Sequence, residues 1–153
     1  IQTSDVWTDE WINWETYERT KKTTKNEWII FNEGEFNGTL IGGNLDTIVG
    51  IIGTEYMPKI TEDTILLLED VYTDLGRLYR NFTTLALHGI FDKIGGLIIS
   101  KFETIGENSD VINDIINEFV GHRKIPILLN FDCGHTHPSC LMPIGGKITL
   151  SLS

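Results

Sequence analysis

The sequence is poor in the features that mark several classes of protein. Two cysteines in 153 residues are too few for a disulfide-stapled scaffold. No apolar run approaches the roughly 18 residues that a membrane-spanning helix needs. No charged segment followed by an apolar stretch opens the chain, so we expect no signal peptide. Together these absences predict a cytoplasmic protein that has no membrane partner.

Positive charge is scarce as well. Twelve Lys and Arg residues stand against 22 Asp and Glu residues, which gives a net charge of −10 at pH 7. The only basic cluster is formed by Lys21, Lys22 and Lys25, and it is flanked by Glu18 and Glu27. A nucleic-acid polymer is therefore not expected as a partner, because its phosphates would be repelled. The hydrophobic fraction of 41% is sufficient for the core of one domain of this length.

Apolar runs and amphipathic segments alternate in the middle of the chain. Buried strands are expected at 64–69, 95–102 and 125–131, with helices at 74–90 and 111–120, the second capped by Ser109. Strand, helix, strand, helix, strand is the signature of an α/β fold. Outside this core we expect strands at 27–32, 36–41 and 147–152, and a helix at 45–52 with Asn44 as its N-cap. Gly42 and Gly43 are predicted to close the second of these strands.

Residues 1–27 differ from the domain that we assign to residues 28–153, and are predicted to form an arm or linker. Trp7, Trp11 and Trp14 follow an i, i+4, i+7 spacing, which is one face of a helix. Such a face either packs on a neighbour or stacks on a planar ligand such as a nucleobase. The first residue is Ile rather than Met, which suggests a fragment of a longer protein.

Acidic and imidazole side chains follow two of the buried strands. Glu69 and Asp70 end the run at 64–69, and residues 132–137 come directly after the run at 125–131. The carboxyl ends of parallel strands share one edge of a sheet, where active sites form. A carboxylate near a histidine is the base-and-orienter half of a hydrolytic triad. The alternative is an acid that caps the next helix and a histidine in a turn.

Two other kinds of chemistry remain open in the same loop. Cys133, His135, His137 and Cys140 are all zinc-ligand types, although their spacing differs from the paired knuckles of structural zinc sites. Either cysteine beside its neighbouring histidine is a candidate nucleophile, although catalytic partners usually converge from distant segments. The third interpretation is two reduced cysteines in a histidine-rich loop. No serine lies in a G-x-S-x-G motif.

Several short motifs, taken in order, resemble one family. They are Gly42–Leu45 with Gly53–Pro58, then Ile65–Asp70, then Gly134–Pro138 leading to Leu141–Gly145. In series they are similar to the C-terminal domain of the LD-carboxypeptidases, serine peptidase family S66, over residues 28–153. The Trp-rich opening is similar to the branch of that family that confers immunity to microcin C.

The resemblance implies a fold and a set of site residues. The fold would be a swivelling-type three-layer α/β domain whose small mixed or parallel sheet is flanked by helices. Glu69 matches the triad Glu of the family, and His135 matches its triad His. Asp70 would be a cap or a supporting residue, and His137 a neighbour of the base. The family uses no metal, and we expect no cofactor.

The resemblance also implies a reaction. The nucleophilic Ser of the family lies in an N-terminal domain that has no counterpart here, so this chain alone is expected to be inactive. The complete serine hydrolase would cleave an amide, either in an L,D-muropeptide or between an aminoacyl group and a nucleotide. Trp7, Trp11 and Trp14 are the candidate substrate-binding residues, and a homodimer is left open. The rival hypothesis is a non-catalytic ligand-binding or interaction domain that keeps the fold.

Overall fold

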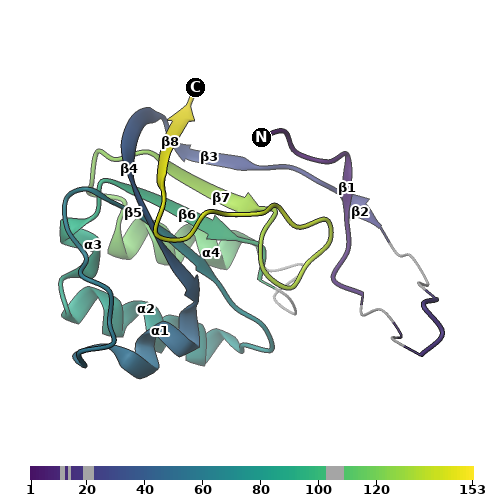
Figure 1. Ribbon diagram of the computed structural model, residues 1–153, viewed down its shortest axis with the longest axis horizontal. Coiled ribbons are helices and arrows are strands. Elements are labelled where there is room, and N and C mark those ends of the chain that lie inside the picture. The colour runs from purple at the N-terminus through teal and green to yellow at the C-terminus, as the bar shows by residue number, and fades with distance from the viewer. Residues whose placement is uncertain (11–12, 14, 19–22, 103–108) are drawn as a thin grey trace.

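The computed structural model describes residues 1–10, 13, 15–18, 23–102 and 109–153 (Figure 1). Over these residues the elements are, in order, β1 (Val6–Trp7), β2 (Thr24–Lys25), β3 (Ile29–Asn32), β4 (Gly34–Asn44), α1 (Leu45–Ile51), β5 (Thr64–Glu69), α2 (Leu75–Leu87), α3 (Ile90–Lys93), β6 (Gly96–Ser100), α4 (Ser109–Phe119), β7 (Ile127–Phe131) and β8 (Lys147–Leu152). None of the helices in the described part of the chain has the length and apolar character to cross a membrane.

A six-stranded mixed sheet forms the centre of the domain. Its strand order is β3-β7-β6-β5-β4-β8. The four inner strands run parallel to one another, and the two edge strands, β3 and β8, pair antiparallel with β7 and β4. Helices connect the parallel strands, as crossovers between parallel strands require. The predicted α/β fold with a mixed sheet flanked by helices is confirmed.

The two faces of the sheet are covered by different parts of the chain. Leu66 and Leu68 of β5 pack with apolar side chains of the helices, which lie along one side of the sheet (Figure 1). Ile65 and Leu67 point to the other face, because successive strand residues alternate. There they join a second cluster, to which Met142 in the segment between β7 and β8 contributes. That segment is the one that carries the histidine-rich motif.

The strand β4 is longer than predicted. We expected Gly42 and Gly43 to end it, but the strand continues through both to Asn44. A Cβ at Gly42 would lie 1.9 Å from the backbone oxygen of Leu67 in β5. The two strands therefore approach closely at this point, and glycine here permits pairing rather than a turn. The strand consequently brings Asn44 level with Glu69 at the sheet edge.

The N-terminal segment differs from its prediction. Trp7 does not begin a helix but lies in the strand β1, paired antiparallel with Thr24 of β2. Trp11 and Trp14 lie outside the described residues. The i, i+4, i+7 spacing was misleading because tertiary pairing overrides such short patterns. Thr8 also forms an isolated antiparallel bridge with His137, so the segment is tied to the loop after β7.

Candidate active site

Glu69 is the last residue of β5, at the carboxyl edge of the sheet. Every residue of this strand is buried, and Glu69 itself is only 7% exposed. Apolar residues on both faces fix the strand between β4 and β6. The carboxylate is therefore held on a rigid element, where little freedom is lost when it binds a partner.

His135 provides that partner. Its Nδ1 lies 2.8 Å from the Oε2 atom of Glu69, across 66 positions of sequence. With the proton on Nδ1, the imidazole donates to the carboxylate. The His135 side chain is 45% exposed, whereas that of Glu69 is 9% exposed. A buried carboxylate thus orients an imidazole that remains open to a reactant, which is the arrangement used by hydrolytic triads.

Gly134 allows this contact, and sequence reasoning missed its role. A Cβ at this position would lie 2.4 Å from Glu69 Oε2, and φ is +86°, a left-handed conformation that favours glycine. The backbone therefore passes directly over the carboxylate one residue before the imidazole. A glycine beside a candidate base was the available signal, because glycine is used where a backbone approaches another group closely.

The loop that carries His135 is anchored at several points. The Cys140 amide donates to the Asp132 carbonyl at 2.7 Å, which joins the two ends of the loop. His137 exchanges two backbone hydrogen bonds of 2.8 Å with Thr8. Among the hydrogen bonds of the described residues, Glu69 bonds to His135 and not to His137. This geometry agrees with the proposed assignment of the two histidines.

Asp70 is buried beside Glu69, and its Oδ1 atom is hydrogen bonded to other groups. Its Oδ1 accepts hydrogen bonds from Asn44 Nδ2 at 3.1 Å and from the Val71 amide at 2.8 Å. Burial raises the pKa of this carboxyl, and these two hydrogen bonds oppose the rise. Asp70 therefore links the end of β5 to Asn44, the residue that caps α1.

The geometry of the described residues does not support the hypotheses of a zinc site or a nucleophilic cysteine. Within the described ranges, no group of three His, Cys, Asp or Glu side chains is arranged to hold a metal ion. Cys133 and Cys140 are both free thiols. Burial raises the pKa of each thiol, which keeps both in the less nucleophilic protonated form.

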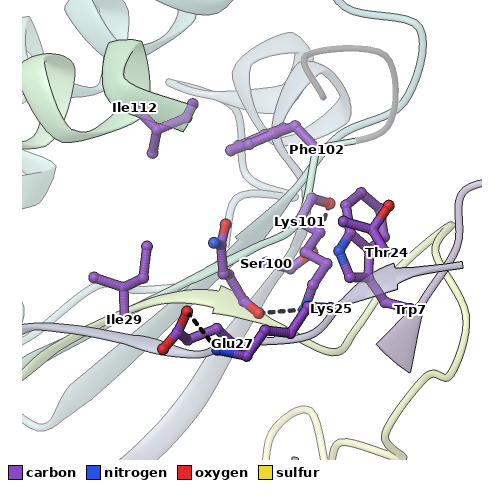
Figure 2. A pocket seen from close by; sticks show the side chains of 10 residues that line it. Trp7, Thr24, Lys25, Glu27, Ile29, Ser100, Lys101, Phe102 and Ile112 are labelled. Atoms are coloured by element: carbon purple, nitrogen blue, oxygen red, sulfur yellow. Dashed lines mark hydrogen bonds and ion pairs between the residues drawn. The ribbon is translucent and has the colours of Figure 1, made fainter. Parts of the chain in front are cut away.

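A pocket of about 280 Å³ lies at the carboxyl ends of β6 and β7. Figure 2 shows Trp7, Thr24 and Lys101 gathered on one side of it, and Ile29 and Ile112 on the other. The Trp7 ring centroid is 5.6 Å from Lys101 Nζ, which is within cation–π range. Of the three predicted substrate-binding tryptophans, Trp7 is thus placed at a pocket, and Trp11 and Trp14 lie outside the described residues.

Comparison with known proteins decides the family. The model of the LD-carboxypeptidase C-terminal domain matches residues 37–150. The chain belongs to this family. It is 37% identical to the microcin C7 self-immunity protein MccF of Escherichia coli, over 95% of this chain and 44% of that protein. It is 36% identical, over 94% of this chain and 44% of the other, to a Vibrio cholerae protein whose name places it among candidate carboxypeptidases.

Solved structures agree with this assignment. A structure of MccF in complex with glutamyl sulfamoyl guanosine matches with a TM-score of 0.86 and 35% identity, over 99% of this chain and 46% of that chain. The resemblance to the S66 family is thereby confirmed, and the relatives of this chain include both MccF and proteins named as carboxypeptidases. The chain spans about half the length of the relatives that it matches.

Proposed function

We propose that this chain is the domain of a serine hydrolase that supplies the general base and its orienting carboxylate. The observation that carries the proposal is the 2.8 Å contact between Glu69 and His135 at the carboxyl edge of the sheet. The buried carboxylate would fix the imidazole tautomer and stabilise the imidazolium that forms during the reaction. His135 would take the proton of the nucleophile and then donate it to the leaving amine.

The nucleophile is proposed to be a serine of an N-terminal domain of the same protein. None of the serine side chains described in this chain hydrogen bonds to His135. Ser100 is 1% exposed, and its hydroxyl donates to the Cys133 carbonyl at 2.8 Å. A serine in that position cannot reach a substrate. The chain matches 44% of the length of MccF. In a protein of that length, the part outside the match would hold the nucleophile and its oxyanion hole.

The proposed substrate is an aminoacyl group joined by an amide bond to a nucleotide-like moiety. Support comes from MccF, the structure of which holds glutamyl sulfamoyl guanosine. Trp7 would contribute a stacking surface for the base, since it lines the pocket beside Lys101. We propose the same role for Trp11 and Trp14. Two free cysteines fit a protein of the reducing cytoplasm, where we propose that it works.

The test is hydrolysis by the full-length protein of two substrates, an aminoacyl-nucleotide amide and an L,D-muropeptide. Glu69→Ala and His135→Ala are expected to lower kcat by about 10³-fold or more, as the loss of a triad member does. His137→Ala is the matched control, because the two hydrogen bonds that join His137 to Thr8 are made by the backbone. It is expected to keep most of the activity.

The outcomes separate the hypotheses. Cleavage of the nucleotide amide alone supports the proposed substrate, and cleavage of the muropeptide alone assigns the protein to the carboxypeptidase branch. Full activity in either alanine variant would overturn the roles of Glu69 and His135. If the well-folded protein cleaves neither substrate, the non-catalytic ligand-binding domain becomes the better hypothesis.

A further inference from the structure

A buried ion pair, whose lysine also lines the pocket at Trp7, lies close to the candidate catalytic residues. Asp132 follows β7 directly, three residues before His135, and is 1% exposed. Lys101 follows β6 and is 4% exposed. The Lys101 Nζ atom lies 2.6 Å from Asp132 Oδ1. Placing two opposite charges in the interior is costly, so a pair of this kind calls for an explanation beyond simple stability.

Every oxygen of the Asp132 carboxylate has donors from distant segments. Asn26 Nδ2 lies 3.0 Å from Oδ1 and 2.9 Å from Oδ2, and Trp28 Nε1 lies 3.0 Å from Oδ2. Lys101 also donates to the Asn130 carbonyl at 2.5 Å, where the backbone has a left-handed φ of 59°. One carboxylate therefore joins the end of β6, the end of β7 and the chain that enters β3.

The same residue fixes the loop that carries His135. The Asp132 carbonyl accepts a hydrogen bond from the Cys140 amide. The two ends of the loop are therefore joined at Asp132, whose side chain is held by the ion pair. Ser100, the neighbour of Lys101, donates to the Cys133 carbonyl. Gly134 and His135 follow Cys133 in the loop. The backbone of Gly134 lies against the Glu69 carboxylate, and the imidazole of His135 hydrogen bonds to it. Two residues, Cys133 and Gly134, separate Asp132 from His135, and both are held by these contacts.

The ion pair also holds the N-terminal segment. The side chain of Asn26 donates to Asp132, and its backbone amide donates to the Asp5 carbonyl at 2.9 Å. Trp7 lies over Lys101, and Thr8 pairs with His137. The pocket at Trp7 and the imidazole of His135 are thus positioned from one anchor. An apolar pair of similar volume would fill the same space without this directional set of hydrogen bonds.

We propose that Asp132, paired with Lys101, is a positioning residue of the hydrolase: it holds the loop so that His135 stays aligned with Glu69 and with the nucleophile. This inference rests on the proposed function. Asp132 does not line the pocket at Trp7, and its effect on kcat is proposed to pass through His135.

The test compares variants of the full-length protein. Asp132→Asn keeps the shape of the side chain but removes its charge, and Lys101→Met with Asp132→Asn removes both charges. In the double variant, kcat is expected to fall about 10²-fold, because a displacement of about 1 Å has that effect on a catalytic group. KM is expected to rise as well, because Lys101 also lines the pocket at Trp7. The matched control is Lys147→Met with Asp63→Asn, an exposed ion pair whose loss is expected to leave kcat unchanged.

Two further measurements distinguish positioning from a purely structural role. In a His135→Ala background, Asp132→Asn is expected to cause no additional loss of kcat, since its effect passes through the missing imidazole. The imidazole ¹⁵N and ¹H signals of His135 are expected to shift in the double variant and not in the surface control. A uniform loss of folded protein would instead lower kcat by the same factor in both backgrounds and would leave the positions of the His135 signals unchanged.

Several results would overturn the proposal. One is a double variant with normal kcat, and another is an equal loss from Asp132→Asn with and without His135. A double variant that fails to fold would show that the pair serves the fold itself. If Glu69→Ala and His135→Ala keep full activity, the proposed function fails first. If they lose activity while the Asp132 variants behave normally, only the positioning role fails.

Discussion

Gly134 is the residue at which the histidine loop comes closest to Glu69. A methyl group there would lie 2.4 Å from Oε2, at a φ of +86°. Gly134→Ala is therefore expected to move the loop away from the carboxylate and to lower kcat of the full-length protein about 10²-fold. The strained backbone is expected to cost about 1–3 kcal/mol of stability. Steady-state kinetics and urea unfolding measure the two effects.

Gly145 offers a matched control for this prediction. It has a similar φ of +82°, but nothing lies within 4 Å of a Cβ built on it. Gly145→Ala therefore carries the backbone strain without the collision and is expected to keep most of the activity. Equal losses of kcat in the two alanine variants would show that contact with Glu69 is not the cause.

Some of the residues at the candidate site could be predicted from the sequence, and others could not. Glu69 could be placed at the sheet edge because it ends an apolar strand, whereas His135 was selected from the loop at 132–137 by the resemblance to the S66 family. Gly134 and Asp132 stood in the same motif region, yet their roles depend on what lies opposite them. Asp132 meets Lys101, Asn26 and Trp28, and no local pattern predicts partners 31, 106 and 104 positions away.

At the scale of elements, prediction succeeded where burial dominates. The strands β5, β6 and β7 are continuous apolar runs because helices cover one face and the loop after β7 covers part of the other. Prediction failed at Gly42, where the close approach of β4 to β5 decides the structure, and at Trp7, where pairing with a distant strand decides it. In both places the deciding contact is absent from the local sequence.

The start of α2 illustrates an element held by one side chain. Asp74 is its N-cap and accepts the Arg77 amide at 2.9 Å. This backbone hydrogen bond lowers the pKa of Asp74 below its ordinary value of 3.8. A lowered pKa means that the charged form stabilises the folded state at pH values above 3.8, and that this contribution is lost as the pH falls further.

Two substitutions separate the cap from its charge. Asp74→Asn keeps an acceptor oxygen and removes the titration, whereas Asp74→Ala removes both. At pH 7 we expect the urea midpoint to decrease in the order Asp, Asn, Ala. Towards pH 2 the difference between the wild-type chain and Asp74→Asn is expected to vanish. A difference that persists unchanged at low pH would contradict the assignment of the pKa shift to this cap.

At the scale of the whole molecule, the candidate functional groups lie at one edge of the sheet. Glu69 and His135 lie at the carboxyl end of β5, and the pocket at Trp7 lies at the carboxyl ends of β6 and β7. In Figure 1 the segment with β1 and β2 extends beyond this same edge. A proposed nucleophile would therefore approach from outside the chain, towards the exposed side of the imidazole.

This arrangement predicts that the 153-residue chain and the full-length protein differ in activity although both contain the proposed pair of Glu69 and His135. The chain alone is expected to show kcat/KM at least about 10³-fold lower on the substrate that the full-length protein cleaves, because both the nucleophile and the oxyanion hole would be missing. The His135 imidazole signals in NMR spectra of the two proteins serve as the control for an intact pair. Comparable hydrolysis by the chain alone would locate the nucleophile within residues 1–153. Serine-to-alanine variants, beginning with Ser139 in the histidine loop, would then identify it.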